Sequence, residues 1–123
     1  MANNYTHYMK NLMLEVVPSV LYISVHEVDP TGVGSNEVVG VDRVAVNFDA
    51  ADAGVRLAQE AFVDLQIPSG SEIAFVGLFT ALTAGNFVAY APVLDGAGDP
   101  TTITFTQDLP FRVADVSLDL NNV

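Results

Sequence analysis

The chain has 123 residues, of which 50% are hydrophobic and 15% are charged, and its fifteen acidic and four basic side chains give a formal net charge of -11. A field of that sign repels phosphate backbones and anionic lipids, so we expect neither direct binding to nucleic acid nor adsorption to a membrane. The chain has no cysteine, which excludes disulfides, thiolate nucleophiles and cysteine-ligated zinc, and its length fits a single domain.

The first eighteen residues are predicted to form an N-terminal helix or arm. Apolar residues recur there at the spacing of one helix face, at Tyr5, Tyr8, Met9, Leu12, Met13 and Val16. Asn3 or Asn4 is available as the N-cap, and Pro18 ends the helix. The polar start is not that of a signal peptide. We expect this helix to dock on its own domain or on a neighbouring protein.

From Val20 onward the hydrophobic period changes to two, which is the pattern of half-buried β-strands. Alternating runs occupy residues 20–27, 43–49, 62–68, 101–107 and 116–120, and Gly, Pro, Asn and Asp separate them. Residues 29–42 are predicted to form a long exposed loop, a candidate contact arm, and residues 50–61 a short helix or a loop. The pattern predicts a mainly β protein, with residues 19–123 forming one β-sandwich or jelly-roll-like domain after a short amphipathic helix.

Residues 73–94 carry no charged side chain and are predicted to form a β-hairpin with its turn at residues 83–86. The stretch is long enough to cross a bilayer, but the residues that flank it, Glu72 and Asp95, are acidic, and Gly77 and Pro92 suit strands better than a helix interior. Its two strands should lie in the middle of a sheet or be covered on both faces.

Candidate catalytic and metal-binding patterns are weak. The two histidines, His7 and His26, are interpreted as surface or interface residues, and no Gly-x-Ser-x-Gly motif is present. No carboxylate pair stands out, and the chain lacks the Trp residues that often hold sugars in glycosidases. Residues 95–99 resemble a calcium loop but fit a hairpin turn better, and residues 32–35 lack the Lys of a phosphate-binding loop. We therefore expect no catalytic residue, no cofactor and no metal.

Several segments, taken in order, resemble a family of small phage virion proteins labelled as tail-fibre or head-decoration proteins. The matching pieces are residues 21–26 followed by a turn at 29–32, the Gly-Ser-Asn-Glu-Val run at 34–38, Arg43 with Val46 and Phe48, the hairpin pieces 77–79, 84–87 and 91–93, and the closing strand 116–120. The sequence departs from the family pattern at Val41 and Asp42, where tyrosine and alanine are usual, and at Thr80, where an acid is usual. The resemblance implies a structural role in the virion.

The low share of charged residues, below the ~25% of ordinary soluble domains, is consistent with a surface partly covered by other subunits. We interpret the chain as a non-enzymatic capsid decoration protein that binds the assembled head. The alternative is a tail or tail-fibre module, which could bind carbohydrate through Tyr22 and Tyr90; a small hydrolase is the least favoured reading. The expected partners are the major capsid protein or tail proteins of the same virion, and further copies of the chain in a homo-oligomer, with a trimer as one form. The candidate interface residues are Tyr5, Tyr8, Met9, Leu12, Met13, Val33, Glu37 and Val38.

Overall fold

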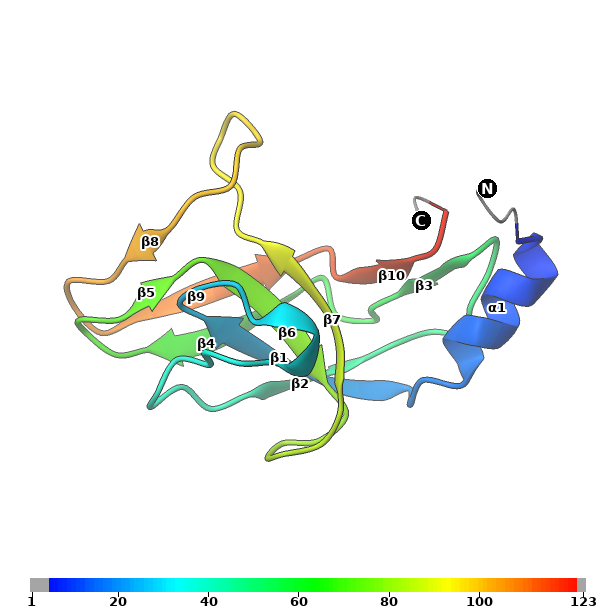
Figure 1. Ribbon diagram of the computed structural model, residues 1–123, viewed down its shortest axis with the longest axis horizontal. Helices are drawn as coiled ribbons and strands as arrows, with labels where there is room; N and C mark the ends of the chain where they lie inside the picture. The colour runs from blue at the N-terminus through cyan, green and yellow to red at the C-terminus, as the bar shows by residue number, and fades with distance from the viewer. Residues whose placement is uncertain (1–4, 122–123) are drawn as a thin grey trace.

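The computed structural model describes residues 5–121, and the chain is mainly β with a short helix near its N-terminal end, as the sequence predicts (Figure 1). The helix is α1 (His7–Glu15), and a short 3-10 helix, η1 (Thr31–Val33), follows the first strand. The strands are β1 (Val20–His26), β2 (Val44–Asn47), β3 (Val55–Leu57), β4 (Phe62–Ile67), β5 (Glu72–Ile73), β6 (Phe75–Phe79), β7 (Phe87–Pro92), β8 (Ile103–Thr104), β9 (Leu109–Ala114) and β10 (Ser117–Asp119).

The strands form two layers around one core. Four of them make an antiparallel sheet in the order β2-β1-β6-β7, while β4 pairs with β9, β3 with β10 and β5 with β8. Both layers contribute to a single buried cluster, β1 through Leu21, Ile23 and Val25 and β4 through Val63, Leu65 and Ile67. The predicted alternation is confirmed in β4, whereas in β1 Ser24 and His26 on the opposite face are buried as well.

The hairpin predicted at residues 73–94 is also confirmed, since β6 and β7 pair antiparallel with Gly77 opposite Tyr90. Strand β6 lies inside the sheet, but β7 lies at its edge and its last three residues are exposed. The expectation that both strands are central or fully covered is therefore wrong for β7. Among residues 5–121, no helix has the length and apolarity that crossing a membrane requires.

The hairpin turn uses Ala84 (φ 54°) and Gly85 (φ 80°) as its left-handed residues, and Asn86 is not one of them. Residues 50–61 are neither a helix nor a plain loop, because they contain β3. A tight turn with left-handed Ala53 and Gly54 precedes this strand and reverses the chain. The alanine-rich composition favours a helix locally, but pairing with β10 overrides that preference.

The segment between β1 and β2, residues 27–43, is folded against the sheet. We call it the cover loop. The backbone N–H of Val38 donates to the carbonyl of Val25 at 2.9 Å, and both Val38 and Pro30 are buried. Most residues of 29–42 are exposed, as predicted, but the buried Pro30 and Val38 and the hydrogen bond from Val38 to β1 hold the segment against the sheet.

Candidate interaction surface

Helix α1 docks on the β domain through polar contacts. The side-chain oxygen of Asn11 accepts a hydrogen bond from the backbone N–H of Gly54 at 2.9 Å, and the Lys10 ammonium donates to the Asn121 side chain at 3.0 Å. Leu14 is the buried residue of the helix. Thr6 is the N-cap, accepting from the N–H of Met9, whereas the predicted caps Asn3 and Asn4 lie outside the described residues.

Arg56, on β3, fixes the C-terminal end of α1. Its guanidinium donates to the carbonyls of Leu14 at 3.0 Å and Val17 at 2.8 Å, and to the carbonyl of Asp49 at 2.8 Å. The carboxylate of Glu15 lies 3.9 Å away, and the Arg56 side chain is buried. A cation at this place satisfies carbonyls that the end of a helix leaves without partners.

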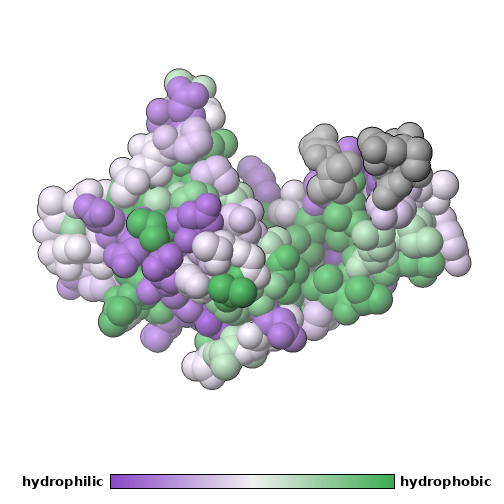
Figure 2. Space-filling model, viewed as in Figure 1, coloured by the Kyte–Doolittle hydropathy of each residue, from purple (hydrophilic) through white to green (hydrophobic). Residues whose placement is uncertain are grey.

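The predicted apolar stripe of α1 faces away from the domain. Tyr8 is 73% exposed and Val16 is 83% exposed. The exposed group also includes Tyr5, Met9, Leu12 and Met13. Figure 2 shows hydrophobic residues gathered over α1 and over the surface beside it. A helix usually turns its apolar face toward its own core, so this orientation leaves a surface that no part of residues 5–121 covers.

Next to α1, the two layers of strands do not close completely. A hollow of about 320 Å³ lies between β6 and β7 on one side and residues 113–118 on the other. A second hollow of about 530 Å³ joins β7 and β10 to the end of α1 through Met13 and Leu14. Both hollows are lined by Ala89, Tyr90, Ser117 and Leu118, so they adjoin, and we call them together the β7–β10 groove.

The three candidate interface residues in the cover loop have different environments. Val33 is exposed, Val38 is buried, and Glu37 pairs with Arg43 through two hydrogen bonds of 2.9 Å. The Arg43 guanidinium also donates to the carbonyls of Ala81 and Ala84 and lies 3.6 Å from the centre of the Phe79 ring. Glu37 and Arg43 therefore join the cover loop to the tip of the β6–β7 hairpin.

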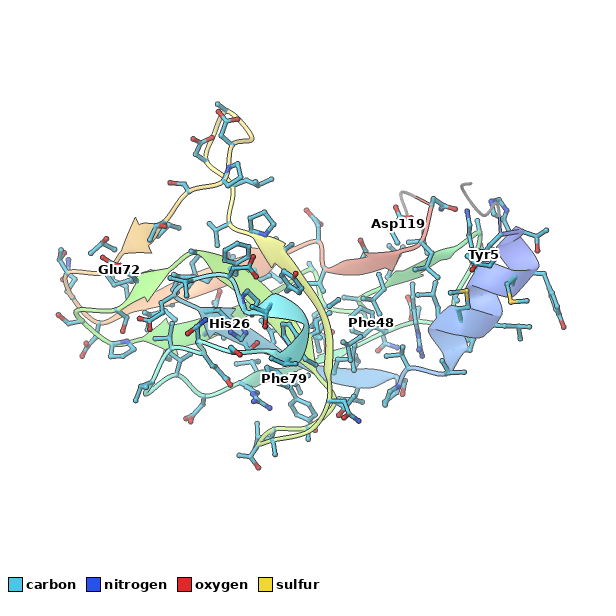
Figure 3. The ribbon with its side chains drawn as sticks, in the orientation of Figure 1. Tyr5, His26, Phe48, Glu72, Phe79 and Asp119 are labelled. Carbon is cyan, nitrogen blue, oxygen red and sulfur yellow. The ribbon has the colours of Figure 1, made fainter. Side chains whose placement is uncertain are left out.

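His26 is fully buried under the cover loop, which corrects its interpretation as a surface residue (Figure 3). Its Nδ1 lies 2.8 Å from the carbonyl oxygen of Ser35, and its Nε2 lies 2.7 Å from the hydroxyl of Ser24. A carbonyl only accepts, so Nδ1 carries the proton and Nε2 accepts from the serine. Burial lowers the pKa of His26 below its usual 6.5, against the raising effects of the Ser35 hydrogen bond and of Glu37. His7 is exposed on α1.

All four basic side chains are used within the chain. Besides Lys10, Arg43 and Arg56, Arg112 donates to both carboxylate oxygens of Asp64, which lowers the pKa of that carboxyl. The outer surface is therefore dominated by acidic groups. Within residues 5–121 no cluster of three or more His, Cys, Asp or Glu could hold a metal ion.

The residues considered for calcium and sugar binding are arranged as follows. The Asp95 carboxylate accepts the backbone N–H groups of Ala97 and Asp99 and thereby closes the turn that the sequence favoured. Tyr22 is half-buried on β1, and Tyr90 is exposed on β7, where it lines the groove.

A two-layer β domain that carries an outward-facing apolar helix and an adjoining groove is typical of proteins that act by packing against other proteins. Residues 2–118 match the family described as Podophage GP4 fiber I protein gp80. The match covers nearly the whole sequence, so the chain belongs to this family and is a virion component. A search of curated proteins gives no match. The family description supports the fibre alternative better than the capsid-decoration interpretation.

Neither the contacts of Arg56 nor the groove was predicted from the sequence, and Arg43 was named only as part of the family resemblance. Each arginine bonds carbonyls far away in the sequence, so no local pattern marks its partners. Arg56 and Arg112 both lie in otherwise apolar runs, yet Arg56 is buried and the Arg112 side chain is 59% exposed, so this pattern alone does not identify the buried arginine.

Proposed function

We propose that the chain is a structural subunit of a phage fibre, and that it acts without catalysis by packing the outward face of α1 against other proteins of the same virion. The orientation of α1 carries this proposal. The helix is held to its domain by Lys10, Asn11 and the Arg56 contacts, while its large apolar side chains face outward.

The exposed residues of α1 suit a contact with another protein. Burying a side chain such as Leu12 contributes about 1.5–3 kcal/mol relative to leaving it in water, so a helix that only covered its own domain would turn this face inward. Aromatic and methionine side chains such as Tyr8 and Met9 are enriched at protein interfaces. The acidic groups elsewhere keep assembled particles apart by repulsion.

Action without catalysis is supported by the environments of the two histidines. His26 is fully buried and its two ring nitrogens are engaged by Ser24 and Ser35, so a substrate cannot reach it. His7 lies exposed on α1, and none of the hydrogen bonds within residues 5–121 engages its ring.

The family description supports a place in a fibre over a place on the head lattice. Tail or fibre proteins are then the first partners to test, and the major capsid protein is the second. Residues 1–18 as the attaching arm and 19–123 as a sandwich domain remain a prediction. Gold-labelled antibody against the chain, imaged on intact virions by electron microscopy, distinguishes fibre from head.

Attachment through α1 is tested with phage that carry Tyr8→Gln and Leu12→Gln together. Glutamine keeps the helix propensity and removes the apolar surface. The matched control is Val39→Gln in the cover loop, where the native side chain is 90% exposed. We expect purified particles to lose the helix variant and to retain the control, as measured by mass spectrometry of virion proteins. Equal incorporation of both variants would contradict the proposal.

Substitution is a sharper test than deletion of residues 1–18. Deletion would leave the buried guanidinium of Arg56 without the carbonyls of Leu14 and Val17. A truncated chain would then lose stability as well as its arm, and loss of attachment could not be assigned to the apolar face.

A further inference from the structure

His26 is a buried titratable side chain that the proposed function does not use. It lies on β1, is 0% exposed, and is bonded to the cover loop through Ser35. We propose that protonation of His26 releases residues 30–38 of the cover loop from the sheet, which makes this segment a lid that opens in acid. The inference goes beyond the proposed function and stands independently of it.

The surroundings of the imidazole ring are aromatic and closely packed. The centre of the ring lies 5.5 Å from that of Phe87 and 6.2 Å from that of Phe79. A Cβ added to Gly34 would lie 2.5 Å from the Phe79 ring, so the backbone of the cover loop lies directly on this ring. The lid therefore encloses His26 together with two apolar side chains that do not solvate a charge.

The hydrogen bonds of the ring suit its neutral form. Nδ1 donates to the Ser35 carbonyl, and Nε2 accepts from the hydroxyl of Ser24, which is 1% exposed. Protonation turns Nε2 into a donor, so the hydroxyl must accept and direct its own hydrogen elsewhere. That hydroxyl has no second hydrogen-bond partner within residues 5–121. Protonation in the closed state thus leaves a buried donor unsatisfied, which is costly.

The charged groups that act on the ring do not compensate a second proton. Glu37 favours the charged form and Arg43 opposes it, and two hydrogen bonds of 2.9 Å already pair these two residues. From the other elements the ring meets a hydroxyl on β1 and the uncharged aromatic rings of the hairpin. Burial has the largest effect and lowers the pKa of His26, against the raising effect of the Ser35 hydrogen bond.

The cover loop is the part of the enclosure that can move at the lowest cost. Strand β1 is paired on both sides, with β2 and with β6. Most of residues 31–37 are exposed, and Thr31 has a left-handed φ of 57°, which is unfavourable for a β-branched residue. Exposed segments with few hydrogen bonds open at a lower free energy than core strands do. Water therefore reaches a charged His26 most easily by displacement of the loop.

The direction of the pH dependence follows from the pKa values of His26 in the two states. In the open state the ring is in water and has the usual pKa of 6.5, whereas in the closed state its pKa is lower. The closed state binds fewer protons, so it is fully favoured above pH 6.5. As the pH falls below that value, the opening constant rises by up to about tenfold per pH unit until the pKa of the closed state is reached.

Thiol labelling measures the opening. Because the chain has no cysteine, Val38→Cys places a single thiol under the lid, and Val63→Cys on β4 is the matched control, since both valines are 8% exposed. Labelling with 4,4′-dithiodipyridine is normalised to the rate of the denatured chain at the same pH. From about pH 7.5 to about pH 5 we expect the rate for Val38→Cys to rise at least about fivefold. At the lower pH it should exceed that of Val63→Cys at least about tenfold.

The histidine responsible is identified by a second substitution in the Val38→Cys chain. His26→Asn keeps an N–H donor near the position of Nδ1 and cannot become charged, so the pH response should disappear. His7 is exposed on α1, and His7→Asn should leave the response unchanged. A response that persists in His26→Asn would overturn the proposal. Equal normalised labelling of Val38→Cys and Val63→Cys would also overturn it, because the whole domain would then unfold.

Hydrogen exchange of the unaltered chain tests the lid without any substitution. The backbone N–H of Val38, which donates to Val25, should lose protection between about pH 7.5 and about pH 5 by the factor found in labelling, after correction for the intrinsic exchange rate. About 1 M urea should change this protection little, because a local opening exposes little surface. Protection of Val38 that is independent of pH, or equal to that of the β4 amides at both pH values, would refute the lid.

Discussion

Replacing Arg56 by methionine removes the cation that joins α1 to β3 and keeps most of the aliphatic volume. The native guanidinium donates to the carbonyls of Asp49, Leu14 and Val17 over 2.8–3.0 Å in a buried setting. Hydrogen bonds from a charged group contribute about 1.5–3 kcal/mol each, and bonds that share one side chain do not add fully. We therefore expect the free energy of unfolding to fall by about 3–4 kcal/mol. For a chain of 123 residues the melting temperature should fall by about 12–16 °C.

The assay is urea unfolding followed by circular dichroism, with Arg112→Met as the matched control. Arg112 donates two hydrogen bonds to the carboxylate of Asp64, but its side chain is 59% exposed. Removing this guanidinium should therefore change stability much less than removing that of Arg56. Hydrogen exchange should show that α1 amides lose protection in the Arg56 variant while β1 amides retain theirs. Equal losses of stability in the two variants, or unchanged protection of α1, would refute the reasoning.

Three further predictions concern the packing around β6. Phe79→Asp places a charge against a buried aromatic cluster and should prevent cooperative unfolding at 25 °C; a melting temperature within a few degrees of wild type would contradict this. Gly77→Ala should destabilise by about 1–3 kcal/mol, because the new Cβ would lie 2.5 Å from a neighbouring ring, whereas Gly96→Ala meets no atom within 4 Å and serves as the control in thermal melts. Burial lowers the pKa of His26, so the folded chain binds fewer protons than the unfolded one; stability should be complete above pH 6.5 and should decline as the pH falls through the folded pKa. The free energy of unfolding measured in urea should depend less on pH in His26→Asn than in the wild type. The same pH dependence in both proteins would show that His26 is not the group responsible.

The strands were predictable where one face is buried and the other is not. In β4, Val63, Leu65 and Ile67 alternate with more exposed residues. The period is visible in the sequence because only the side chains on the buried face must be apolar. In β1 the same pattern located the apolar face correctly but gave His26 the wrong environment. The cover loop helps to bury the second face of β1. The His26 ring on that face also packs against Phe79 and Phe87, which come from a hairpin distant in sequence.

The interaction surface was predictable only in part. Helical spacing identified the apolar stripe of α1 but left open whether it docks on its own domain or on a neighbour. The side toward which the stripe faces depends on the hydrogen bonds of Asn11 and Arg56. Each of these residues lies about forty residues from its partner in the sequence, so the contacts leave no periodic signal. Ala89 and Ala91 line the groove at a sheet edge, and two alanines in an apolar run look the same whether or not another strand covers them.

The strand pairing has a consequence for the point during translation at which the chain can fold. Strand β4 pairs with β9, and β3 pairs with β10, which is the final strand of the described range. Neither pair can form until its later strand has left the ribosome, so these long-range pairings slow folding. The apolar side of α1 precedes all the strands, so it is exposed before the domain that carries it has folded. Apolar surface exposed at that stage favours aggregation, so binding by chaperones would raise the yield of folded protein.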